Sequence, residues 1–150
     1  HAEHLTMPNF HPFLVHFPVA LLSLSLLMEI AAVLRRKEAL SRVGWWCQLW
    51  GTLGLAAGVA TGLLAEKSIH VAPIVRPFID RHKEFAFISM ALFAALLLWR
   101  SGTRSKLPPG YAGLFILLYA GGILVLWAGA WYGGEMVYRF GLGVTTGRLL

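Results

Sequence analysis

Histidine is the residue type in this chain whose placement is most informative about chemistry. There are six, at positions His1, His4, His11, His16, His70 and His82. The hydropathy pattern predicts a membrane protein, and all six histidines fall on what would be one face of it. Imidazole binds iron, copper and zinc, so this one-sided placement predicts a metal or haem centre near one membrane surface.

The elements that would position these histidines are long apolar stretches. The chain is 57% hydrophobic, and its few charges lie between the stretches. A helix needs about 20 apolar residues to cross a bilayer, and four stretches come close to that length. The expected spans are residues 12–34, 44–65, 82–99 and 111–132. They use most of residues 1–150 and predict a single all-α domain, an integral membrane four-helix bundle.

The short connections favour an up-down-up-down bundle, and the basic residues orient it. Lysine and arginine favour the cytoplasmic side, and those after the first and third spans have a single acid, Glu38, among them. These basic residues are Arg35, Arg36, Lys37, Arg42, Arg100, Arg104 and Lys106. The bases on the opposite side are interspersed with four acids: Glu66, Asp80, Glu84 and Glu135. Both termini are therefore expected outside. The net charge of +6 is then a topology signal, and no soluble basic face is left for nucleic acid.

A longer connection, residues 66–81, joins the second and third spans on the outer side. It contains several apolar residues, and Pro73 and Pro77 argue against a continuous helix. We expect it to lie on the outer surface.

Two histidines are expected at matched depth. Span one opens with HPFLVHFP, in which Pro18 should bend the helix and His16 lies about one turn inside. His82 opens span three, which enters from the same surface on the diagonal helix of the bundle. Opposed imidazoles in this arrangement are suited to a six-coordinate haem iron. His11, five residues before His16, is expected as a substitute ligand or a supporting donor.

Span two carries a face of small residues. Gly51, Gly54, Gly58 and Gly62 recur every three or four residues. Such a face most often lets two helices pack closely. The alternative is a groove for a flat porphyrin, with Gly54, Gly58 and Gly62 as its lining. Covalent attachment of haem is excluded, because the chain has one cysteine, Cys47.

An acidic residue, Glu29, lies deep in span one, where an ionisable group is costly. It is expected to stay protonated, to pair with Arg42, or to belong to a proton path.

Several motifs together carry a resemblance to a known family. They are HPFLVHFPVALL, GLAAGVATGLL, the histidine that opens span three, and GGEMVYRFGLGV. In these the chain resembles the bacterial membrane family called domain of unknown function 2231. The resemblance implies a small four-span module found alone or beside cytochrome c and Rieske-type modules, and so a redox role. That family usually has a histidine at the position of Phe140, which leaves His11, His16 and His82 as the matching histidines.

The resulting hypothesis is a small b-type cytochrome-like electron-transfer subunit of the bacterial inner membrane, with periplasmic termini. Haem b would be bound by His16 and His82 near the periplasmic face. The expected partners, besides the lipid bilayer, are a periplasmic cytochrome, a quinone or other subunits of a membrane redox complex. The alternatives are a cofactor-free accessory subunit of a respiratory or photosynthetic complex and a metal-handling membrane protein. A stand-alone enzyme is less expected, because no nucleophile, base and acid stand at related positions.

Overall fold

The computed structural model describes residues 11–68 and 71–142, and within these ranges it contains helices and no strand. The helices are α1 (His11–Leu14), α2 (His16–Arg35), α3 (Glu38–Ser68), α4 (Arg76–Gly102) and α5 (Ala112–Tyr138). Four segments are long and apolar enough to cross a membrane, with α1 and α2 together forming the first. The expected all-α, four-span membrane fold is confirmed.

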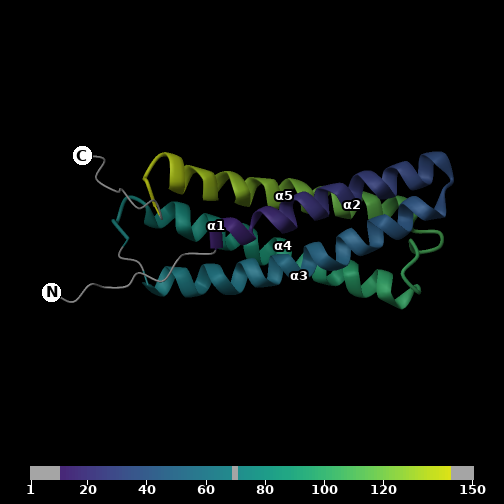
Figure 1. Ribbon diagram of the computed structural model, residues 1–150, viewed down its shortest axis with the longest axis horizontal. Coiled ribbons are helices and arrows are strands. Elements are labelled where there is room, and N and C mark those ends of the chain that lie inside the picture. The colour runs from purple at the N-terminus through teal and green to yellow at the C-terminus, as the bar shows by residue number, and fades with distance from the viewer. Residues whose placement is uncertain (1–10, 69–70, 143–150) are drawn as a thin grey trace.

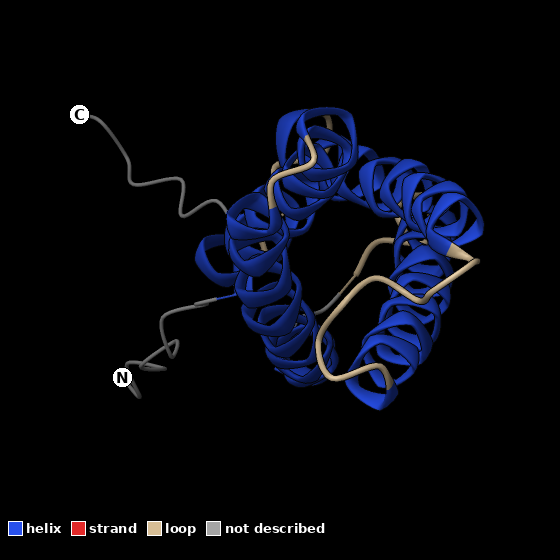
Figure 2. Ribbon diagram, turned by 90° about the vertical axis from the view of Figure 1, so that its right-hand side faces the viewer, coloured by secondary structure: helices blue, strands red, loops and turns tan. Residues whose placement is uncertain are grey.

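The four long helices form two hairpins. Helix α2 packs along α3, and α4 packs along α5. The hairpins lie side by side through the α3–α4 and α2–α5 contacts, so α2 and α4 are diagonal to each other (Figures 1 and 2). We call the boundary between the hairpins the seam. The end of the bundle that carries His11 and the α3–α4 connection is the histidine end, and the end with the connections 36–37 and 103–111 is the arginine end.

The first span is broken near its start, at Val15 between α1 and α2. A proline ring clashes with the carbonyl four residues earlier and leaves it without its helical donor. For Pro18 that carbonyl belongs to Leu14, the residue at which α1 ends. The expected bend is therefore a break three residues before the proline. The interruption is confined to this lost hydrogen bond, because Val15 keeps helical angles (φ −68°, ψ −17°) and its N–H donates to the carbonyl oxygen of His11 at 3.2 Å. Helix α1 contacts α3 as well as α2.

The helices extend beyond the apolar stretches at the histidine end. Helix α4 begins at Arg76, with Pro77 in its first turn, where a missing N–H removes no helical hydrogen bond. Residues 76–81, expected in the surface segment, are therefore helical. The added turns carry charged residues that form ion pairs between α3 and α4. The carboxylate of Glu66 lies 2.9 Å from Lys83 Nζ and 3.2 Å from Arg76 Nη1.

The interior and the outer surface of the bundle are both apolar. All four long helices contribute to one buried cluster: Leu22, Leu55, Phe93, Leu96, Phe115, Tyr119, Ile123 and Leu126. Large apolar side chains also cover the outside. Leu98 and Leu117, for example, are 73% and 69% exposed. A continuous apolar exterior of this kind is suited to lipid rather than water.

Candidate functional site

The structure brings His11 and His82 together at the histidine end. Their ring centroids are 6.1 Å apart, and the ring planes are nearly perpendicular, at 85°. His11 belongs to α1, which packs on the first hairpin, whereas His82 belongs to α4 of the second hairpin. The two rings therefore face each other across the seam, and both are only partly exposed.

The protein holds each ring through Nδ1. His82 donates from Nδ1 to the carbonyl oxygen of Gly129 at 2.8 Å. His11 Nδ1 lies 3.2 Å from the hydroxyl of Thr61, whose own proton is directed at the carbonyl oxygen of Ala57, 2.9 Å away. Because that hydroxyl has one proton, His11 is best described as the donor in the first bond. A ring that donates from Nδ1 carries its proton on that nitrogen, which is the tautomer of histidines that bind metals through Nε2.

Each ring also lies against a glycine. A Cβ added to Gly62 would stand 2.9 Å from Cε1 of His11, and one added to Gly133 would stand 3.2 Å from Cε1 of His82. Both distances are too short for an undisturbed side-chain contact. The glycines thus let the rings approach α3 and α5 closely. The sequence indicates Gly133 only as a small residue of span four, within the Gly-Gly pair of the closing motif, and does not assign it to a site.

His16, expected opposite His82, is exposed, and its Nδ1 donates to the carbonyl oxygen of Pro12 at 2.6 Å. His11 and His16 are five residues apart and so lie on different faces of the first span, and the face of His11 is the one that packs on α3 against Thr61 and Gly62. His11, expected as a substitute, therefore occupies the position facing His82. His1, His4 and His70 lie outside the described residues.

The glycine face of α3 is occupied by the first span. Gly51 lies against Leu22, and Gly62 lies against His11. A Cβ on Gly54 would be 3.4 Å from Pro18, and one on Gly58 would be 3.6 Å from Val15. These glycines serve close packing of α1 and α2 on α3, so a porphyrin has no groove along this face.

A buried ion pair lies at the opposite end of the bundle. Arg100 of α4 and Glu29 of α2 are 0% and 1% exposed, with Nη2 and Oε1 2.5 Å apart. The Oε2 atom of Glu29 accepts a hydrogen bond from Ser41 at 2.8 Å. The partner of Glu29 is thus Arg100 rather than Arg42. Arg100, expected in a connecting loop, lies within α4.

All three guanidinium nitrogens of Arg100 also donate hydrogen bonds to other residues. Nη1 donates to the side-chain oxygen of Gln48 at 3.1 Å, Nη2 to the carbonyl oxygen of Ser41 at 2.9 Å, and Nε to that of Ser105 at 3.1 Å. The guanidinium also lies 5.6 Å from the ring centroid of Trp45. A buried charge is tolerated when it is paired in this way, so the cluster joins α2, α3 and α4 at the arginine end.

The two ends differ in what they offer a ligand. At the histidine end, two imidazoles face each other, and two is the number of protein ligands that a six-coordinate haem iron takes. No group of three or more His, Cys, Asp or Glu that could hold a metal ion occurs among residues 11–68 and 71–142.

Comparison with known proteins places the chain in a family. The model of the family described as "Predicted membrane protein (DUF2231)" matches residues 7–146. The match covers most of the chain, so the protein belongs to this family. No curated protein and no solved structure matches it.

Proposed function

We propose that this member of the DUF2231 family is a small electron-transfer subunit of the membrane, in which His11 and His82 are the axial ligands of a b-type haem. The observation that carries the proposal is the pair of rings facing each other across the seam. It differs from the ligand set expected from the sequence in one position, His11 in place of His16.

The separation of the rings fits a single metal atom between them. Metal–imidazole bonds of about 2 Å on opposite sides of one iron leave the two ring centroids about 6 Å apart. The observed separation is 6.1 Å. This agreement is between the ring separation and the two axial bonds of the proposed iron. The face of α3 formed by Gly54 and Gly58 is filled, which leaves the seam as the region shared by both ligands.

When bound, the haem would supply the one-electron redox chemistry. The protein would orient the ligands and set the polarity around them. Gly129 fixes the His82 ring through its carbonyl oxygen, and Thr61 holds His11. One turn from His82, Phe85 stacks on Tyr132 with centroids 5.6 Å apart. Such an apolar surrounding limits water and tunes the potential of a metal centre.

The place of the pair near one end of the bundle supports exchange of electrons at a membrane surface. A periplasmic cytochrome, a quinone or a neighbouring subunit of a redox complex would be the partner. This role needs the histidine end to face the periplasm, which the distribution of basic residues favours.

The test is the cofactor content of the full chain, expressed with added haem precursor and purified in detergent. We expect about one haem per chain and sharp low-spin bands after reduction with dithionite. Metal analysis of the same sample distinguishes haem iron from copper or zinc. A protein with neither haem nor metal would overturn the proposal in favour of the cofactor-free accessory subunit. Stoichiometric copper or zinc without haem would also overturn it, in favour of metal handling.

A further inference from the structure

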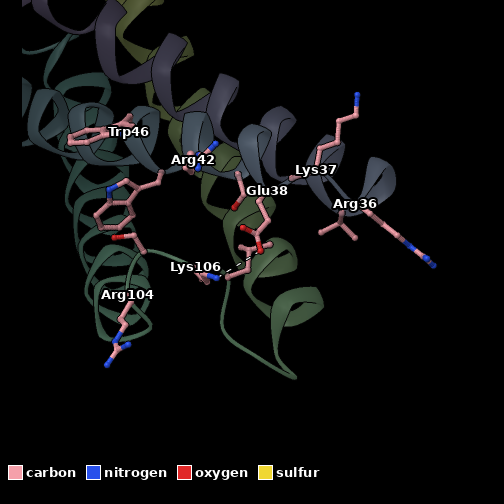
Figure 3. A pocket seen from close by; sticks show the side chains of 13 residues that line it. Arg36, Lys37, Glu38, Arg42, Trp46, Arg104 and Lys106 are labelled. Carbon is pink, nitrogen blue, oxygen red and sulfur yellow. Dashed lines mark ion pairs between the residues drawn. The ribbon is translucent and has the colours of Figure 1, made fainter.

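A second candidate binding site lies at the arginine end, far from the histidine pair. It is a hollow of about 660 Å³ between the α2–α3 turn, the first turns of α3 and the α4–α5 connection. Five basic residues line it: Arg36, Lys37, Arg42, Arg104 and Lys106. Figure 3 shows Arg42 and Lys106 beside Glu38, whereas Arg36, Lys37 and Arg104 extend outward from the rim.

These cations are largely without acidic partners. Of these five residues, only Lys106 forms an ion pair within the described part of the chain: its Nζ lies 3.7 Å from Oε1 of the exposed Glu38. At the histidine end, by contrast, most of the described cations are paired: Arg76 and Lys83 with Glu66, Arg81 with Glu84, and Arg139 with Glu135. The lining of the hollow therefore carries an excess of positive charge, with Glu38 as its one acid.

The backbone around the hollow is held in an uncommon conformation. Arg36, Arg104 and Ser105 have φ angles of 51°, 55° and 65°. They are the only residues other than glycine with positive φ in the described chain, and all three line the hollow. Arg36 is the left-handed C-cap of α2, and Arg104 and Ser105 lie in the α4–α5 connection. Here the Ser105 carbonyl accepts the hydrogen bond from Arg100 Nε, so the buried ion-pair cluster supports this wall.

One side of the hollow is apolar and faces lipid. Val33, Trp45 and Trp46 belong to its lining, and Val33 and Trp46 are 50% and 56% exposed. Tryptophan is typical of the boundary between headgroups and hydrocarbon. An occupant that uses the whole lining must therefore combine a negative group with an apolar tail.

We propose that this hollow binds the headgroup of an anionic phospholipid, such as phosphatidylglycerol. Arg42 and Lys106 hold the phosphate, the outward cations turn in to support it, and an acyl chain runs along Val33 and Trp46. Basic pockets between helices on the cytoplasmic side suit such headgroups, and arginine gives directed bonds to phosphate oxygens. The site is independent of the proposed haem.

The test measures the thermal stability of the purified full chain in neutral detergent. Mixed micelles containing phosphatidylglycerol should raise the midpoint of unfolding by roughly 2 to 4 °C relative to phosphatidylcholine. Native mass spectrometry should show one phosphatidylglycerol retained under conditions that remove phosphatidylcholine. Inorganic phosphate at the same concentration should give no shift. An equal shift with phosphate alone would overturn the lipid and indicate a site for a free anion.

Two variants of equal charge separate the site from a general charge effect. Arg42→Gln with Arg104→Gln and Lys106→Gln should abolish the shift. Lys67→Gln with Arg81→Gln and Arg139→Gln, which removes three cations from the histidine end, should keep it. An equal loss in both variants would overturn the proposal. If the first variant unfolds, the retained lipid is counted instead on the single variants Arg42→Gln and Lys106→Gln, and unchanged retention in both would contradict it.

Discussion

The two ends of the bundle bury polar side chains in different ways. At the arginine end, each nitrogen of the Arg100 guanidinium donates to a protein oxygen, and Glu29 lies within the same cluster. At the histidine end, the protein anchors each ring through Nδ1 and directs the rings toward each other across the seam. A guanidinium paired at each nitrogen is suited to holding helices together, whereas two imidazoles directed at each other are suited to binding a ligand.

The difference predicts that stability depends mainly on the arginine end. Replacement Arg100→Met leaves Glu29 buried without its partner and should lower the free energy of unfolding by about 3 to 5 kcal/mol. This free energy is measured by unfolding the protein in mixed micelles with increasing dodecyl sulfate. The control is Arg104→Met, which removes the same charge from an exposed position and should cost less than about 0.5 kcal/mol. Equal stability of the two variants would mean that the buried cluster is not a clamp.

A smaller effect is expected from the glycine that accommodates the ion pair. A Cβ on Gly44 would overlap the carboxylate of Glu29. Gly44→Ala should therefore destabilise the bundle by about 1 to 3 kcal/mol in the same assay. Gly58→Ala is the matched change on the same helix, because its Cβ would meet Val15 at an ordinary 3.6 Å. If Gly58→Ala proves the more harmful of the two, the packing described for α3 is incorrect.

At the histidine end, a glycine substitution should weaken the proposed haem binding more than it lowers the free energy of unfolding. Gly62→Ala places a Cβ 2.9 Å from His11 Cε1 and must shift that ring. Disturbing the support of a metal ligand typically weakens binding by roughly 10- to 100-fold. Haem titration of the apoprotein measures this, with Gly121→Ala as control, since nothing lies within 4 Å of its Cβ. Unchanged affinity in Gly62→Ala would argue against His11 as a ligand.

The last prediction concerns the orientation of the bundle in the membrane. The variants that test it should be as stable as the wild type. Single cysteines at Lys37, Arg104 and Lys67 are introduced with Cys47→Ser. The first two lie at the arginine end and should react with an impermeant thiol reagent only after the membrane is opened, whereas the third should react from outside. The reverse pattern would place the histidine pair at the cytoplasmic surface.

Hydropathy was enough to predict the four spans and their order, because membrane burial leaves long uninterrupted apolar runs. It could not predict where the helices end: α4 begins at Arg76 because its first turn accepts Pro77 and its charges pair with α3. Hydropathy also places Arg100 in a connecting loop, because it marks only the apolar stretch. The burial of Arg100 depends on acceptors from α2 and α3 that the local sequence does not show.

The candidate site was predicted in part. The sequence indicated His82 and a partner from the start of span one, but regular helical spacing favoured His16 at the expected depth. The two histidines are five residues apart and lie on different faces of the span, and the packing of α1 on α3 selects the face of His11 to meet His82. The role of Gly133 depends on a contact between α4 and α5, which no pattern within either helix encodes.

The central claim is that His11 and His82, and not His16, bind one iron. Electron paramagnetic resonance of the oxidised protein tests it in the wild type, His11→Ala and His16→Ala. We expect a low-spin ferric signal from the wild type and from His16→Ala, and its loss or conversion to high spin in His11→Ala. A low-spin signal that survives His11→Ala and disappears in His16→Ala would contradict the account.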